Sequence, residues 1–166
     1  MTKRVLVHEV DPAATAAVKV MSNYVRESGF DPQLHELVKI RASQINGCAY
    51  CLDLHNRDAR AAGEDQRRLD VLSAWREAES LFNERERAAL AFTEAVTLIA
   101  DDGVSDEVWD AVARCFEPAE IVQLLMAIST INVYNRLAVA THRPLRGASS
   151  SAVRHYSESI GGADLT

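Results

Sequence analysis

Two cysteines three residues apart, followed four residues later by a histidine, have the clearest chemical potential in this 166-residue sequence. The run is Cys48-Ala-Tyr-Cys51-Leu-Asp-Leu-His55, and Glu36 precedes it by twelve residues. Residues three and four positions apart share one face of an α-helix, so both thiols and the imidazole are expected on a single stripe. A pair of thiols beside a proton acceptor is typical of thiol redox chemistry.

The reactive form of such a pair is the thiolate. A thiol with a pKa of about 8.5 is only about 3% ionised at neutral pH. Lowering that pKa to about 7 requires about 2 kcal/mol of preference for the charged form. A helix N-terminus supplies about 0.3–1 kcal/mol of this, and it would act most on Cys48, just after Asn46-Gly47. His55 instead reaches Cys51, so the residues alone leave open which sulfur is activated.

Glu36 and Tyr50 are the next candidates for the site. If helices near 32–45 and 48–62 form an antiparallel hairpin, Glu36 meets His55 and orients its ring, as a third group orients the base in nucleophile-base sites. Tyr50 lies between the thiols and either shapes the site entrance, donates its hydroxyl, or packs as an aromatic residue. Cys115 has no partner in sequence and is expected to be a core residue.

A metal site is the main alternative for the same side chains. Cys48, Cys51, His55 and Glu36 could together supply four zinc ligands. A structural zinc site usually draws a second ligand pair from elsewhere in the sequence, and this sequence has no such pair. Haem attachment requires a histidine directly after the second cysteine, where Leu52 stands. A redox pair is therefore favoured, and neither a metal nor a cofactor is expected.

The composition narrows the possible partners and the compartment. The formal net charge is −6, and no block of Lys and Arg occurs, which argues against a nucleic-acid or anionic-membrane partner. The N-terminus shows no signal-peptide pattern, so a cytoplasmic location is expected. In a reducing compartment, a close pair among three cysteines is more often catalytic, redox-sensing or metal-binding than structural.

Helical periodicity and clear helix-start signals predict an all-α chain. Asp11-Pro12, Asp31-Pro32 and Glu117-Pro118 place proline in a first helical turn, and Asn83 and Ser105 are candidate caps. Only residues 4–10 have a hint of strand alternation. The predicted helices lie near 11–28, 32–45, 48–62, 66–80, 84–101, 105–115 and 118–140.

The segment 121–141 is apolar and about as long as a membrane span, but it carries Gln123, Asn132, Asn135 and Arg136. It is therefore expected to be a buried or interface helix, and a homo-oligomer is predicted from it. Residues 1–146 are predicted to form one domain, and 147–166, which are small and polar, a mobile tail or an arm that orders on a neighbouring subunit.

The run from Glu36 to His55 resembles the alkylhydroperoxidase D (AhpD) branch of the carboxymuconolactone decarboxylase family. The glutamate, both cysteines and the histidine match at the family's spacing. A looser resemblance continues through Ala74-Trp75-Arg76, 84–97 and 131–136, so that roughly residues 15–142 are covered. The resemblance implies an AhpD-like fold of six to eight helices that assembles into dimers or trimers, and often into hexamers.

The resemblance also implies an activity, a thiol-dependent peroxidase of antioxidant defence. In such enzymes the second cysteine, here Cys51, attacks the hydroperoxide and becomes a sulfenic acid. Cys48 then resolves it as a disulfide, Glu36 and His55 relay the proton, and a dithiol donor such as a lipoyl group regenerates the enzyme.

One departure from the family's pattern limits this analogy. Some peroxidases of this group carry a second histidine where this chain has Tyr50, which bears on the rate and on the electron donor. The decarboxylase branch generally lacks the cysteine pair, so lactone decarboxylation is disfavoured.

The alternative function is a redox-sensing or thiol-disulfide exchange protein without peroxide turnover.

Overall fold

The computed structural model describes residues 4–147, and within them it contains eight α-helices and no β-strand. The predicted all-α class is therefore confirmed. The helices are α1 (Val7–Val10), α2 (Pro12–Glu27), α3 (Pro32–Ile45), α4 (Ala49–Ala61), α5 (Gln66–Val71), α6 (Glu84–Thr97), α7 (Asp106–Cys115) and α8 (Pro118–Thr141). Two short 3₁₀ helices, η1 (Leu72–Ala74) and η2 (Glu79–Leu81), lie between α5 and α6. Nearly all of the predicted tail, residues 148–166, lies outside the described residues.

The helix starts follow the predicted signals. The side chains of Asp11, Asp31, Asn83 and Ser105 each accept a hydrogen bond from a backbone N–H of the helix that they precede. Each such bond satisfies a donor that has no partner inside the helix. The sequence therefore determines where α2, α3, α6 and α7 begin.

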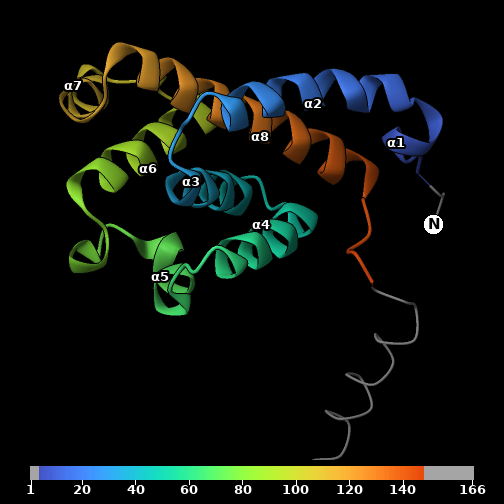
Figure 1. Ribbon diagram of the computed structural model, residues 1–166, viewed down its shortest axis with the longest axis horizontal. Coiled ribbons are helices and arrows are strands. Elements are labelled where there is room, and N and C mark those ends of the chain that lie inside the picture. The colour runs from blue at the N-terminus through green and yellow to red at the C-terminus, as the bar shows by residue number, and fades with distance from the viewer. Residues whose placement is uncertain (1–3, 148–166) are drawn as a thin grey trace, which may run out of the picture.

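Helix α3 is the centre of the bundle. It packs against α4, α6 and α8, and Leu37, Val38 and Ile40 on it are fully buried. Figure 1 shows α2 and α8, which pack together, in the upper part of the molecule. Helix α3 lies below them, and α4 lies below α3. This arrangement leaves the α3–α4 hairpin, which carries the cysteines, directly under α8.

Helix α8 is buried along one face, in line with the buried or interface helix predicted for 121–141. Leu124, Ile128 and Ile131 are fully or almost fully buried, whereas Val122 and Leu125 are exposed. Within residues 4–147, no helix has both the length and the apolar character needed to span a membrane.

Two helix predictions were wrong in their extent. The helix predicted over 66–80 ends at Val71, and the chain then tightens into η1 and a turn. This turn lets both Trp75 and Phe82 enter the cluster around Leu72, and the Trp75 indole N–H donates to Glu94 of α6 at 2.8 Å. Tertiary packing thus overrides a weak helical preference.

The helix predicted over 84–101 ends at Thr97. Leu98 and Ile99 extend the apolar pattern in sequence, yet they are 46% and 61% exposed, so no packing holds them in the helix. The weak strand alternation at 4–10, which was too little to predict a sheet, does not form a strand: Val7–Val10 form the single turn α1, and residues 4–147 hold no strand.

Candidate active site around the cysteine pair

The predicted hairpin between α3 and α4 is present, and its turn is fixed from α8. Gly47 has a φ of 63°, a left-handed conformation that suits glycine and reverses the chain before Cys48. The Asn46 side-chain amide donates to the side-chain oxygens of Asn132 at 2.9 Å and Asn135 at 3.0 Å. Asn135, which is fully buried, donates in turn to the hydroxyl of Ser43 at 3.0 Å. The polar residues of α8 therefore anchor the turn that presents the thiols.

The two thiols lie in contact at the start of α4. The sulfur atoms of Cys48 and Cys51 are 2.7 Å apart, and both cysteines are free and buried. Cys48 is the N-cap residue of α4, and its sulfur accepts the backbone N–H of Cys51 at 3.4 Å. A disulfide bond is about 2.05 Å long, so only a small movement separates this dithiol from a disulfide.

In the reduced pair, Cys48 is the thiol that ionises more readily. The hydrogen bond from the Cys51 thiol is the main cause that lowers the pKa of Cys48 to about 6; burial opposes it, and the Cys51 backbone N–H and the Asn135 amide add to it. The same hydrogen bond, together with burial and the charge on Cys48, raises the pKa of Cys51 well above its ordinary value. This agrees with the helix-terminus argument from the sequence, which favoured Cys48.

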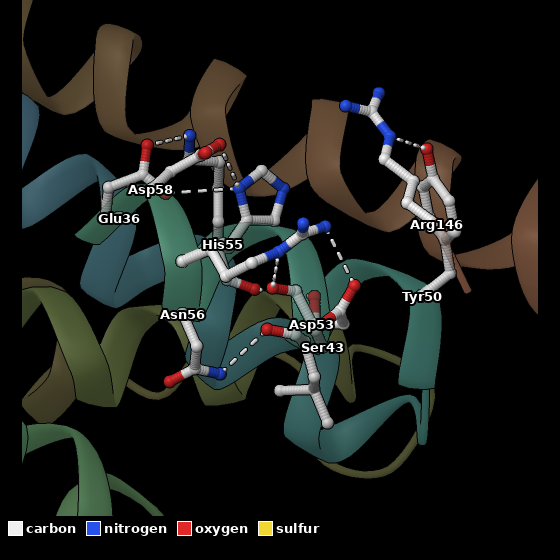
Figure 2. Close-up of polar contacts among 11 residues, drawn as sticks. Glu36, Ser43, Tyr50, Asp53, His55, Asn56, Asp58 and Arg146 are labelled. Atoms are coloured by element: carbon white, nitrogen blue, oxygen red, sulfur yellow. Dashed lines mark hydrogen bonds and ion pairs between the residues drawn. The ribbon is translucent and has the colours of Figure 1, made fainter. Parts of the chain in front are cut away.

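Glu36 and His55 meet as expected. Nδ1 of His55 lies 3.1 Å from Oε2 of Glu36, and Lys39 donates to Oε1 of Glu36 at 2.5 Å. Figure 2 shows the imidazole held against Glu36, with its other nitrogen directed away from the carboxylate. Burial alone raises the pKa of Glu36, but the bonds from His55 and Lys39 outweigh it and leave the pKa lowered. The ionised Glu36 favours a proton on Nδ1 and leaves Nε2 as an acceptor.

The zinc arrangement considered from the sequence is not assembled. The ligand atoms of Glu36, His55 and Asp58 lie within 4.8 Å of one another, but the two sulfurs are not part of that group. Asp58 is exposed, and the other oxygen of Glu36 is already bonded to Lys39.

A cavity of about 290 Å³ lies beside the pair and distinguishes the two sulfurs. Cys51 and His55 both line this cavity, whereas Cys48 lines a separate hollow of about 270 Å³ together with His142. No hydrogen bond joins His55 to Cys51 among the described residues. Besides Cys51 and His55, the residues lining the cavity are Thr15, Ser22, His35, Lys39, Tyr50, Leu54, Ala127, Thr130, Ile131, Tyr134, Ala138, Arg143 and Arg146.

Tyr50 takes two of the roles considered for it, since it lines the cavity and packs as a buried aromatic residue. Its ring is buried and lines the cavity, and its hydroxyl accepts a hydrogen bond from Nε of Arg146 at 3.0 Å (Figure 2). The guanidinium carbon of Arg143 lies 4.1 Å from the centre of the same ring. Cys115 is partly buried and packs against the core cluster that includes Val112.

Sequence reasoning missed several residues of the cavity. Lys39 could have been found, because it follows Glu36 by three positions on the same helix face. Arg143 and Arg146 carried no local signal, because only the fold brings the end of α8 back to the start of α4. Asn135 was noticed as a polar residue in an apolar helix, but its link to the thiols depends on how α8 packs.

His35, which also lines the cavity, predicts a loss of stability in mild acid. Burial, followed by the charge of Lys39, lowers the pKa of His35 from 6.5 to about 4. Between those two values the unfolded chain binds a proton that the folded chain excludes, so the free energy of unfolding falls as the pH falls from 6.5 to 4. We expect His35 to contribute a loss of about 2 kcal/mol between pH 7 and pH 5.

Urea unfolding at the two pH values measures this loss. His35→Phe should reduce the pH dependence by about 2 kcal/mol, and the same measurement on a variant of the exposed His8, His8→Asn, should not change it. An equal pH dependence in His35→Phe and the unmodified protein would contradict the prediction.

Comparison with known proteins agrees with the fold. The model of the carboxymuconolactone decarboxylase family matches residues 12–95. An uncharacterised Bacillus subtilis protein, YdfG, is 37% identical over 140 residues, which cover 84% of this chain and 95% of YdfG.

Solved structures share the same arrangement of helices. A crystal structure from Agrobacterium tumefaciens has a TM-score of 0.84 and 37% identity, and the match covers 87% of this chain and 98% of that one. That protein is of unknown function and is described as a candidate antioxidant defence protein, AhpD. An uncharacterised peroxidase-related protein from Silicibacter sp. TM1040 has the same fold, with a TM-score of 0.70 and 24% identity over 80% of this chain and 70% of that one. The present chain therefore belongs to the carboxymuconolactone decarboxylase family and has an AhpD-like helical fold.

Proposed function

We propose that this protein is a thiol-dependent peroxidase that reduces hydroperoxides through a disulfide cycle between Cys48 and Cys51. The observation that carries the proposal is the 2.7 Å contact between the sulfurs, one of which, Cys51, lines a cavity that it shares with His55. The Agrobacterium relative, described as a candidate antioxidant defence protein, supports the same class of function.

In the first step, the thiolate of Cys51 attacks the outer oxygen of the hydroperoxide. An S–O bond forms and the O–O bond breaks, so Cys51 becomes a sulfenic acid and the alkoxide takes a proton and leaves as an alcohol. Before this attack, the thiolate of Cys48 accepts the proton of the Cys51 thiol across the contact between the two sulfurs. This transfer makes Cys51 the thiolate. His55, oriented by Glu36, is the proposed group that moves a proton at the cavity, through the substrate oxygen or a water.

In the second step, Cys48, which has released to solvent the proton that it took from Cys51, attacks the sulfur of Cys51. The S–S bond forms, the S–O bond breaks, and the hydroxide takes a proton and leaves as water. The pKa of about 6 suits Cys48 to this role, because the thiol is largely ionised at neutral pH. A dithiol reductant, for which a lipoyl group is the proposed example, then reduces the disulfide by two exchanges and is itself oxidised to a disulfide.

Steady-state turnover tests this proposal. The reduced protein is mixed with hydrogen peroxide or cumene hydroperoxide and with dithiothreitol or dihydrolipoamide as the donor. We expect one alcohol and one oxidised donor for each organic hydroperoxide consumed. The absence of turnover with every donor, while the disulfide still forms readily, would reject the peroxidase and favour the alternative below.

That alternative is thiol-disulfide exchange or redox sensing without peroxide turnover. Cys48 favours this alternative, because it is the first cysteine of a C-x-x-C and stands at the start of a helix. The pKa of Cys48 is lowered, and Cys48 lines a hollow that is separate from the cavity of Cys51. Lowered pKa values in C-x-x-C pairs are found in disulfide oxidoreductases. A disulfide that exchanges with protein dithiols but is not formed by stoichiometric hydroperoxide would support it.

We also propose that the protein acts in the cytoplasm as a homo-oligomer, a dimer, trimer or hexamer. Val20 and Tyr24 of α2 and Val122 and Leu125 of α8 are apolar and 39–69% exposed, on two helices that pack together (Figure 1). Exposed apolar groups of this kind often mark an interface between subunits. Light scattering that finds a monomer at micromolar concentration would remove this part of the proposal.

A further inference from the structure

The charged side chains of the cavity beside Cys51 are all of one sign. Lys39, Arg143 and Arg146 line it together with His35 and His55, and none of the described residues that line it is acidic. The whole chain, by contrast, has a formal net charge of −6. Cations gathered in one cavity of an acidic protein point to an anionic ligand.

The end of α8 brings two of these cations to the cavity. His142 caps α8 in the left-handed conformation, with φ 52° and ψ 49°, and the backbone N–H of Arg143 bonds to the carbonyl of Ala138 at 2.9 Å. This cap turns the chain back toward α4, where Arg146 donates to the Tyr50 hydroxyl and Arg143 stacks on the Tyr50 ring. Both guanidinium groups are thus held against a buried aromatic residue adjacent to Cys51 in sequence.

Neither guanidinium is neutralised by a carboxylate among residues 4–147. The other cation, Lys39, is different, because its ammonium group is bonded to Glu36. Arg146 uses Nε for Tyr50, which leaves its two terminal nitrogens as donors. The charge of Arg143 acts on Cys51 and on Tyr134, so this guanidinium lies within electrostatic reach of the reactive sulfur.

The rest of the wall combines apolar side chains with the hydroxyl groups of Thr15, Ser22 and Thr130 and the rings of Tyr50 and Tyr134. Leu54, Ala127, Ile131 and Ala138 line the cavity, whose volume of about 290 Å³ is at the lower end of the usual range for ligand sites, about 300–1,000 Å³. The apolar part of this wall suits a small hydrocarbon body. A bound molecule would therefore have an apolar body with an anionic group at one end.

We propose that the preferred substrate is an organic hydroperoxide that carries a carboxylate, with the carboxylate at Arg143 and Arg146 and the peroxide group at Cys51. This proposal rests on the peroxidase function proposed above and adds the substrate class. The chemistry of the step is unchanged: the carboxylate is bound and takes no part in bond breaking.

A matched pair of substrates tests the proposal. Cumene hydroperoxide and its para-carboxylate share the same peroxide group and ring and differ only in the added carboxylate group. In single-turnover reactions with the reduced protein, we expect a second-order rate constant about tenfold to hundredfold higher for the carboxylate, the effect of one or two hydrogen bonds to a charged group. The ratio of the two constants should fall as the salt concentration rises, because salt screens the charge.

Arg143→Gln and Arg146→Gln should each lower this ratio, and the double variant should bring it close to one. Arg60→Gln is the matched control, because Arg60 is an exposed arginine of α4 that does not line the cavity; it should leave the ratio unchanged. A ratio of one in the unmodified protein, or an unchanged ratio in the double variant, would overturn the proposal while leaving the peroxidase function intact.

A binding measurement tests the carboxylate site independently of the peroxidase function. 4-Isopropylbenzoate has the same body and charge but no peroxide group. Titration calorimetry should show that it binds the unmodified protein, and that the double arginine variant binds it at least tenfold more weakly. Binding of this anion without any hydroperoxide turnover would reject the peroxidase and keep the anion site, whereas equal binding by both proteins would reject the anion site.

Discussion

Cys51→Ser is expected to reduce the rate of hydroperoxide reduction by at least about 10³-fold, because it removes the proposed attacking sulfur. A serine hydroxyl at this position has no comparable nucleophilicity at neutral pH. Consumption of cumene hydroperoxide by the reduced protein in the presence of dithiothreitol measures the loss. Circular dichroism of the same sample should be unchanged, since the substitution changes one atom at a buried site.

Cys48→Ser is the matched control for this prediction, because it removes the other sulfur of the same contact. It should still react once with hydroperoxide and leave a sulfenic acid on Cys51 that dimedone labels, but it should form no internal disulfide. If Cys48→Ser lost the first reaction and Cys51→Ser kept it, the two roles would be exchanged. That outcome would mean that the lower pKa of Cys48, rather than access from the cavity, determines which sulfur attacks.

Asn135→Leu is the second large effect, and it acts on both the fold and the thiols. The Asn135 side chain is fully buried, accepts from Asn46 and donates to Ser43. A leucine of similar size breaks both bonds, so we expect the free energy of unfolding to fall by about 2–4 kcal/mol in urea titrations. Asn56→Leu is the control: among the residues that the structure describes, Asn56 bonds only to the Leu52 carbonyl of its own helix, and a loss below about 1 kcal/mol is expected.

A second readout separates a merely structural role for Asn135 from an effect on the site. Its amide helps to lower the pKa of Cys48, so the midpoint of thiolate formation, followed by ultraviolet absorbance, should rise above the value of about 6 in Asn135→Leu. The Asn56→Leu midpoint should stay in place. An unchanged midpoint in Asn135→Leu would contradict the proposed contact with the thiols, even if the variant were less stable.

Much of the site geometry was predictable because it depends on local signals. Asp31 and Pro32 determine the start of α3, and Asn46-Gly47 determines the turn, so the antiparallel hairpin follows and brings Glu36 to His55. The helix-terminus argument alone favoured Cys48 as the more acidic thiol, and its N-cap position and its lowered pKa agree with that argument. These inferences required only spacing and capping chemistry.

The remaining features depend on contacts between distant segments, and the sequence carried no signal for them. The end of the helix at Val71 follows from the bond between Trp75 and Glu94, which lie nineteen residues apart. Arg146 meets Tyr50 across ninety-six residues. Cys51 lines one cavity and Cys48 lines a separate hollow. This difference between the sulfurs likewise depends on how the helices pack and has no signal in the sequence.

The most direct test of the proposed function is the reaction of the fully reduced protein with one equivalent of cumene hydroperoxide and no reductant. Free thiols are counted, the alcohol is measured, and the intact mass and a peptide digest identify the bond formed. We predict one alcohol per chain, the loss of two thiols, and a disulfide that joins Cys48 to Cys51 while Cys115 stays free. A protein that keeps both thiols and leaves the hydroperoxide unreacted would contradict the account.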